Sequence, residues 1–127
     1  MSKLQAYRKT AVTTATKEQV LIMLYEGAIK HLNKAYEACQ KNDLATKGTA
    51  VGKAHDIINE LNNTLDFEIG GEIAKNLERL YMFMIDEITK GNINNDATKF
   101  ESVRKLLENL LEGWKGALAQ LQQQKQA

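Results

Sequence analysis

The strongest constraint on the fold is one stretch, residues 16–40, whose apolar side chains recur at helical spacing around a wide arc. At about 100° per residue they cover roughly 200° of the helix surface, about twice what an ordinary surface helix needs for its core. These side chains are Val20, Leu21, Met23, Leu24, Tyr25, Ala28, Ile29, Leu32, Ala35 and Tyr36. The stretch is therefore predicted to be a helix that faces both the core of its own chain and a second, docking surface.

The remainder of the chain favours three more helices. None of its 127 residues is proline, and an internal proline would remove a helical hydrogen bond and clash with the preceding turn. Apolar residues spaced by three, four or seven predict helices at about 17–41, 43–65, 71–90 and 96–122. Because short loops make consecutive helices antiparallel neighbours, we expect an all-α fold, an antiparallel up-down four-helix bundle, with residues 1–127 as a single domain.

Residue types typical of helix ends support these bounds. Thr16 and Gln19 have the spacing of a capping box, and Gly91 is expected to end the third helix as a left-handed cap. The other expected boundaries are Asn42 as a cap, a break at Gly70-Gly71, and Asn95 or Asp96 as a cap. Residues 1–15 contain isolated apolar residues and a β-branched cluster that disfavours helix, which predicts an extended, mobile N-terminal arm.

Charge and cysteine content exclude several classes of protein. The 17 basic and 16 acidic side chains give a net charge of +1, and both signs are mixed along the chain. No large field therefore attracts a phosphate backbone, and nucleic acid is not an expected partner. The single cysteine excludes an internal disulfide, no apolar run is long enough for a membrane span, and no charged-then-apolar leader opens the chain. We expect a reduced, cytoplasmic protein.

The sequence lacks the residue patterns of catalytic or metal centres. A di-metal site in a four-helix bundle needs Glu-x-x-His pairs, and the residue three positions before His31 or His55 is alanine or glycine. Cys39 lies on the apolar arc without a neighbour that would stabilise a thiolate, so it is expected to be buried. Gly70-Gly71 lacks the preceding strand and the lysine of a phosphate-binding loop. We expect no enzymatic activity, no metal and no cofactor.

Apolar residues at the edges of the helical stripes are the candidates for partner contacts. Val20, Leu24, Ala28, Leu32 and Ala35 are assigned to the core. The edge residues, and the unbroken run from Tyr81 to Ile85, fit a partner surface about as well as a core. The candidate partner-binding residues are Tyr7, Val12, Leu21, Ile22, Tyr25, Ile29, Tyr36, Tyr81, Met82 and Phe83.

Two glycines also point to a close contact. Gly48 and Gly52 lie one turn apart in the expected second helix, where each costs about 1 kcal/mol relative to alanine. Such a cost indicates close approach of a neighbouring helix or of a ligand chain, and we expect packing within the bundle.

Three blocks of the sequence resemble a known family. The first block is Tyr7, Val12, Thr14-Ala15-Thr16, Glu18-Gln19 and the run from Leu21 to Ile29. The second is Leu65-Asp66, Gly70-Gly71-Glu72-Ile73-Ala74, Leu77 and Leu80-Tyr81, and the third is Asp96, Val103, Leu106-Leu107, Leu110 and Trp114. Together they resemble the flagellin-specific export chaperones of bacterial flagella, the FliS family, over nearly the whole chain. Lys17 departs from the family pattern, which usually has proline there.

The resemblance implies a cytosolic chaperone that binds the disordered C-terminal segment of flagellin, prevents its premature polymerisation and hands it to the export gate of the flagellar type III system. A disordered client loses conformational entropy when it binds. Its contact with the chaperone must therefore be extensive and apolar. Residues 1–15 are expected to form a movable cover over part of the client groove. Without client, a monomer or weak homodimer is expected.

A different class of function remains open at this point. The excess apolar stripe also fits a self-associating structural bundle whose stripes form a homodimer interface. Both hypotheses predict exposed apolar surface on an isolated monomer.

Overall fold

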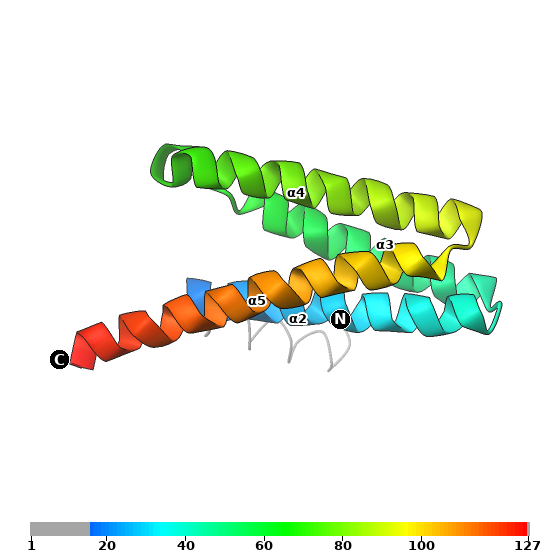
Figure 1. Cartoon of the computed structure of the whole chain (residues 1–127), viewed down its shortest axis with the longest axis horizontal. Coiled ribbons are helices and arrows are strands. Elements are labelled where there is room, and N and C mark those ends of the chain that lie inside the picture. The colour runs from blue at the N-terminus through cyan, green and yellow to red at the C-terminus, as the bar shows by residue number, and fades with distance from the viewer. Residues whose placement is uncertain (1–15, 127) are drawn as a thin grey trace, which may run out of the picture.

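The structure, a computed structural model, describes residues 16–126, and these form four helices. They are α2 (Lys17–Gln40), α3 (Leu44–Asn63), α4 (Phe67–Asn94) and α5 (Ala97–Gln126). Figure 1 shows consecutive helices running in opposite directions, with α5 extending past the other helices at its C-terminal end. Helix α2 packs against α3 and α5, and α4 packs against the same two helices, so α2 and α4 lie diagonally. The expected all-α four-helix bundle is confirmed; the expected N-terminal arm lies outside the described residues.

The start of α2 agrees with the predicted capping box. The backbone N–H of Gln19 donates to Thr16 Oγ1 at 3.1 Å, and the N–H of Thr16 donates to Gln19 Oε1 at 3.0 Å. Both donors belong to the first turn, where the helix itself offers no acceptor.

The loop between α2 and α3 differs from the expectation. Asp43, not Asn42, caps α3, because its carboxylate accepts from the backbone N–H of Thr46. Asn42 instead adopts a left-handed conformation with φ of 55°, which asparagine tolerates better than most residues. The prediction that Asn42 is the cap is therefore wrong by one residue.

Helix α4 is longer than the predicted 71–90 at both ends. It begins at Phe67 with Asp66 as its cap, and the chain kinks at Gly71, where φ is 52° and ψ is −125°. The double glycine therefore bends the helix after its first turn instead of preceding it.

At the other end of α4, Gly91 is buried and helical, and the left-handed cap is Asn95. A Cβ at Gly91 would come within 2.9 Å of Lys99 Cβ and 3.0 Å of Phe100 Cε1. The prediction that Gly91 ends the helix is wrong, because this glycine allows α5 to approach α4.

A continuous core runs along the bundle. Ala28, Leu32 and Ala35 are fully buried, as predicted, whereas Val20 and Leu24 are partly exposed. Cys39 is also buried. The core residues contributed by the other helices include Ile58, Leu61, Met84, Ile88, Phe100, Val103 and Leu107.

Gly48 and Gly52 do not serve packing within the bundle. A Cβ built at either position would meet nothing within 4 Å, so the prediction of an intramolecular contact there is wrong. Both lie on the surface of α3 with room for a larger side chain.

Polar contacts fasten one end of the bundle, where α2 ends, α3 begins and α4 turns into α5; we call it the closed end. Lys47, although buried, donates from Nζ to the carbonyl oxygen of Asn92 and to Asn95 Oδ1, both at 3.0 Å. This ammonium satisfies a carbonyl at the negative end of α4. Cys39 Sγ donates to the same Asn95 oxygen at 3.3 Å.

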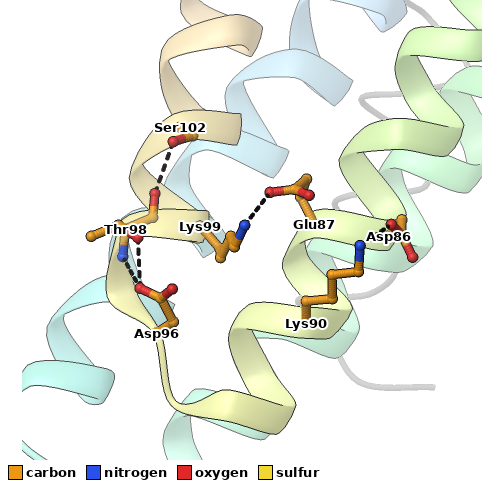
Figure 2. Close-up of polar contacts among 7 residues, drawn as sticks. All are labelled: Asp86, Glu87, Lys90, Asp96, Thr98, Lys99 and Ser102. Carbon is orange, nitrogen blue, oxygen red and sulfur yellow. Dashed lines mark hydrogen bonds and ion pairs between the residues drawn. The ribbon is translucent and has the colours of Figure 1, made fainter.

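The α4–α5 turn adds a further set of contacts at the closed end (Figure 2). Asp96 begins α5 by accepting from the backbone N–H and the hydroxyl of Thr98, at 3.1 and 2.6 Å. One turn further along α5, Lys99 reaches across to Glu87 of α4 at 3.0 Å. These contacts hold α4 and α5 together where Gly91 brings their backbones close.

Candidate binding site at the open end

The opposite end of the bundle contains an apolar hollow that we call the mouth. All four helices or their ends contribute to it: Leu21 from α2, Thr64 and Leu65 after α3, Ile73 and Leu77 from α4, and Trp114 from α5. A second hollow continues from it along the start of α2 and shares Leu21 and Thr64 with the mouth. The remaining lining residues of the two hollows are Lys17, Glu18, Val20, Leu24, Asp66, Ile69, Gly70, Ala74 and Tyr81.

The first turns of α4 leave apolar side chains exposed beside the mouth. Ile69 is 88% exposed and Ile73 is 69% exposed. The kink at Gly71 separates them, and a Cβ at the neighbouring Gly70 would come within 2.8 Å of Ala74 Cβ. Large exposed apolar side chains around an open, mainly apolar hollow are the surface expected of a binding site for another apolar segment.

Tyr81 and Trp114 line the mouth, and Tyr81 is hydrogen bonded to the buried Tyr25 of the core. Tyr25 of α2 and Tyr81 of α4 are 0% and 1% exposed, and their hydroxyls hydrogen bond at 2.5 Å across the diagonal of the bundle. Their rings lie 6.4 Å apart between centroids with an interplanar angle of 57°. Trp114 of α5 lines the mouth beside Tyr81.

Burial and the hydroxyl bond together set the pKa values of the two phenols. Burial raises the pKa of Tyr25, and hydrogen bonding by Tyr81 and the nearby Trp114 partly offsets that increase. Burial also raises the pKa of Tyr81, and the bond to Tyr25 raises it further. Both phenols stay neutral at physiological pH.

A third hollow lies on the other side of α2, between its first turns and the C-terminal part of α5. It is lined by Gln19, Ile22, Met23, Lys115, Leu118, Ala119 and Gln122. Met23 is 43% exposed at its edge. The N-terminal turns of α2 are therefore flanked by apolar hollows on both sides, which accounts for the excess width of its apolar arc.

The described residues offer no metal centre and no membrane-spanning segment. Within residues 16–126, no group of three His, Cys, Asp or Glu side chains is placed to hold a metal ion. None of the described helices combines the length and apolar character that a membrane crossing requires.

Comparison with known proteins identifies the family. A family model described as "Flagellar protein FliS" matches residues 1–121. This chain belongs to the FliS family. The flagellar secretion chaperone FliS of Salmonella typhimurium is 43% identical over 108 residues, which cover 84% of this chain and 80% of that protein. The flagellar secretion chaperone FliS of Vibrio cholerae is 38% identical over 115 residues, covering 87% of this chain and 85% of that protein.

The FliS family consists of chaperones and not of enzymes, so this chain is a flagellar export chaperone. A solved structure described as a crystal structure of a flagellar chaperone from bacteria shares its fold. The TM-score is 0.77 at 21% sequence identity, over 94% of this chain and 99% of the other.

In this FliS-family bundle the predicted partner-binding residues fall into different places. Leu21 lines the mouth, and Ile22 lines the hollow between α2 and α5. Ile29 and Tyr36 are partly buried against the core. On the outer surface of α4, Met82 and Phe83 are 50% and 49% exposed. Tyr7 and Val12 lie outside the described residues.

Tyr25 and Tyr81 need a correction. They were predicted to contact a partner, but both are core residues, and only Tyr81 reaches the edge of the mouth from below. Helical spacing does not distinguish a tyrosine at a surface from one in a core, because the ring is apolar and its hydroxyl is polar. Here the two hydroxyls hydrogen bond to each other between diagonal helices.

Several mouth residues of this FliS-family chain were not among the predicted contacts. Leu65, Ile73, Leu77 and Trp114 line the mouth and have the spacing of apolar helical stripes, but this spacing does not show where a stripe runs past the packed core. The position of a residue along the bundle could have identified these mouth residues. In antiparallel helices, the beginnings of α2 and α4 meet the ends of α3 and α5. Apolar residues at those four helix ends therefore share one end of the molecule.

Proposed function

We propose that this flagellar export chaperone binds the C-terminal segment of flagellin, holds it in the apolar mouth and the adjoining hollows along α2, and keeps it from polymerising until export. The observation that supports this most is the mouth itself: an open apolar hollow lined from all four helices in a member of the FliS family. Disordered segments bind such surfaces by folding an apolar face into a groove.

The energetics favour a long contact. Ordering a client residue costs about 1–2 kcal/mol, whereas burying a large apolar side chain contributes about 1.5–3 kcal/mol. Only a segment that buries many apolar side chains gains net affinity. The hollows on both sides of α2 provide more contact than the mouth alone, and Ile29, Met82 and Phe83 remain proposed contacts for a client that wraps around the bundle.

The proposal places the protein in the cytoplasm, where it meets newly made flagellin and delivers it to the export gate of the flagellar type III system. It also implies that the client-free protein is a monomer or a weak homodimer. The alternative, a homodimer that buries the same apolar residues, competes for the same surface.

A matched pair of isoleucines on α4 tests the binding site. Ile73 borders the mouth, whereas Ile93 is 76% exposed at the closed end of the same helix. We expect Ile73→Gln to weaken binding of a synthetic flagellin C-terminal segment by about 1 kcal/mol or more, because a buried apolar contact is lost. Ile93→Gln should leave the Kd within about twofold of the wild-type value. Titration calorimetry measures both.

Light scattering during the same titration distinguishes the alternative. A one-to-one complex gives the combined mass of the chaperone and the segment. A protein that remains homodimeric and ignores the segment at tens of micromolar would refute the proposal, and equal effects of the two substitutions would place the segment elsewhere.

A further inference from the structure

Another hollow lies between α2 and α3, and we call it the basic hollow. Its volume is about 260 Å³, and it shares no lining residue with the mouth or with the two apolar hollows beside α2. The exposed side chains of Lys34 from α2 and Lys53 from α3 line it, together with His31. Among the described residues that line it, none is acidic. The basic hollow therefore presents positive charge from two helices.

The two lysines of the basic hollow lack the counter-ions that other lysines of this chain have. Lys75, Lys90 and Lys105 each pair with a carboxylate one turn away on the same helix. Within residues 16–126, neither Lys34 nor Lys53 forms an ion pair. Both ammonium groups are therefore available to an anion from outside the chain.

The acidic side chains nearest along the two helices do not neutralise this charge. Glu37 and Asp56 each follow one of the two lysines by three residues, and neither pairs with it. Asp56 instead lies 3.6 Å from Nδ1 of His55. Lys30, one turn before Lys34, adds a third positive charge on the same side of α2.

The shape of the basic hollow suits a short stretch of peptide. Its α3 wall consists mainly of short side chains, including those of Ala45, Thr49 and Ala50, so a bound backbone can approach the helix. From Ala45 to Lys53 the wall is about 12 Å long at the rise of a helix. An extended segment of about four residues spans that length.

The hydrogen-bond donors of this wall are already used, which disfavours phosphate as the ligand. The backbone N–H of Thr46 donates to the Asp43 carboxylate at 3.2 Å, and the hydroxyl of Thr49 donates to the carbonyl oxygen of Ala45 at 3.1 Å. Asp43 also occupies the positive end of α3, where a phosphate would otherwise bind. Two separate ammonium groups remain, and each can pair with one carboxylate.

We propose that the basic hollow binds an acidic peptide segment of a partner protein, with one carboxylate at Lys34 and a second at Lys53. The proposal does not rest on the proposed function, and it leaves the mouth free for a client. Because exposed ion pairs contribute little each and are screened by salt, the interaction is weak and salt-dependent.

The test titrates the ¹⁵N-labelled full chain with a blocked hexaglutamate peptide at low salt. We expect the amide resonances of Thr49, Ala50 and Lys53 to shift, whereas the indole resonance of Trp114 at the mouth should stay in place. The Kd should rise at least about threefold when the salt concentration increases from about 20 to about 150 mM. Hexaglutamine, which has the same length without the charge, should shift none of these resonances.

A matched pair of double variants locates the site. Lys34→Gln with Lys53→Gln should raise the Kd for hexaglutamate at least about fivefold, because both ion pairs are lost. Lys90→Gln with Lys105→Gln removes the same net charge from two other exposed lysines and should stay within about twofold of the wild-type value. All four lysines are exposed, so urea midpoints should show that both double variants remain folded.

Three results would overturn the proposal. They are an equal loss of affinity in both double variants, no resonance shift in the basic hollow at millimolar hexaglutamate, and the same shifts with inorganic phosphate at equal concentration. Failure of a flagellin segment to bind the chain would refute the proposed function alone, because the hexaglutamate titration contains no flagellin.

Discussion

At the scale of single residues, Gly91 and Gly113 lie in different surroundings, so a substitution by alanine has opposite effects on stability at the two positions. Gly91 is enclosed: besides Lys99 and Phe100, a Cβ there would lie 3.1 Å from the backbone oxygen of Asp96. Gly113, in α5, would meet nothing within 4 Å. The same substitution therefore produces strain at one position and only a gain in helix propensity at the other.

We expect Gly91→Ala to destabilise the bundle by about 1–3 kcal/mol, because α4 and α5 must separate to admit the methyl group. Gly113→Ala should stabilise it by about 0.5–1 kcal/mol, since alanine loses less backbone entropy in a helix. Urea unfolding of both variants measures the two signs. A Gly91→Ala variant as stable as Gly113→Ala would show that the α4–α5 junction is not closely packed.

At the scale of helices, aspartate caps make the bundle sensitive to acid. The hydroxyl and backbone N–H of Thr98 hold the pKa of Asp96 below its usual value, and those of Thr46 do the same for Asp43. A carboxylate whose pKa is lower in the folded state contributes stability that is fully present above its unfolded pKa, about 3.9, and is lost as the pH falls through the folded pKa.

We therefore expect the urea midpoint of the wild-type chain to fall between about pH 5 and pH 2, and the fall to be smaller in the Asp43→Asn, Asp96→Asn double variant. Asparagine still caps a helix but does not titrate in this range. Midpoints measured across this range for both proteins decide the matter; parallel curves would show that other carboxylates dominate the acid response.

Also at the scale of helices, the apolar periodicity predicted the fold more reliably than the site. Spacing located all four helices because each has one buried stripe, and the Thr16–Gln19 box located the start of α2. Glycine was misread at Gly91 because the sequence shows a flexible residue without showing whether it turns the chain or admits a neighbour. Part of the mouth was missed because helical spacing gives only the side of the helix on which a residue lies. Burial also depends on how far along the helix axis the residue is.

At the scale of the whole molecule, residues 1–15 are predicted to cover part of the client site, and they lie outside the described residues. A cover that competes with the client lowers its apparent affinity, so deletion of residues 1–15 should lower the Kd for the flagellin C-terminal segment by about threefold or more. Titration calorimetry of the full and shortened chains measures this change. An unchanged Kd would leave the arm without a covering role, and a weakened affinity would make the arm a client contact.

The two ends of the bundle also differ in how they hold it together. Within residues 16–126, the polar contacts that join different helices include the Tyr25–Tyr81 pair next to the mouth and the contacts of Cys39, Lys47 and Lys99 at the closed end. The rim residues Leu21 and Ile73 take part in none of these contacts. Substitutions at independent sites change stability separately, so exchange of rim residues should leave the contacts of the closed end in place. We therefore expect relatives of this chain to differ more often at the rim of the mouth than at the closed end.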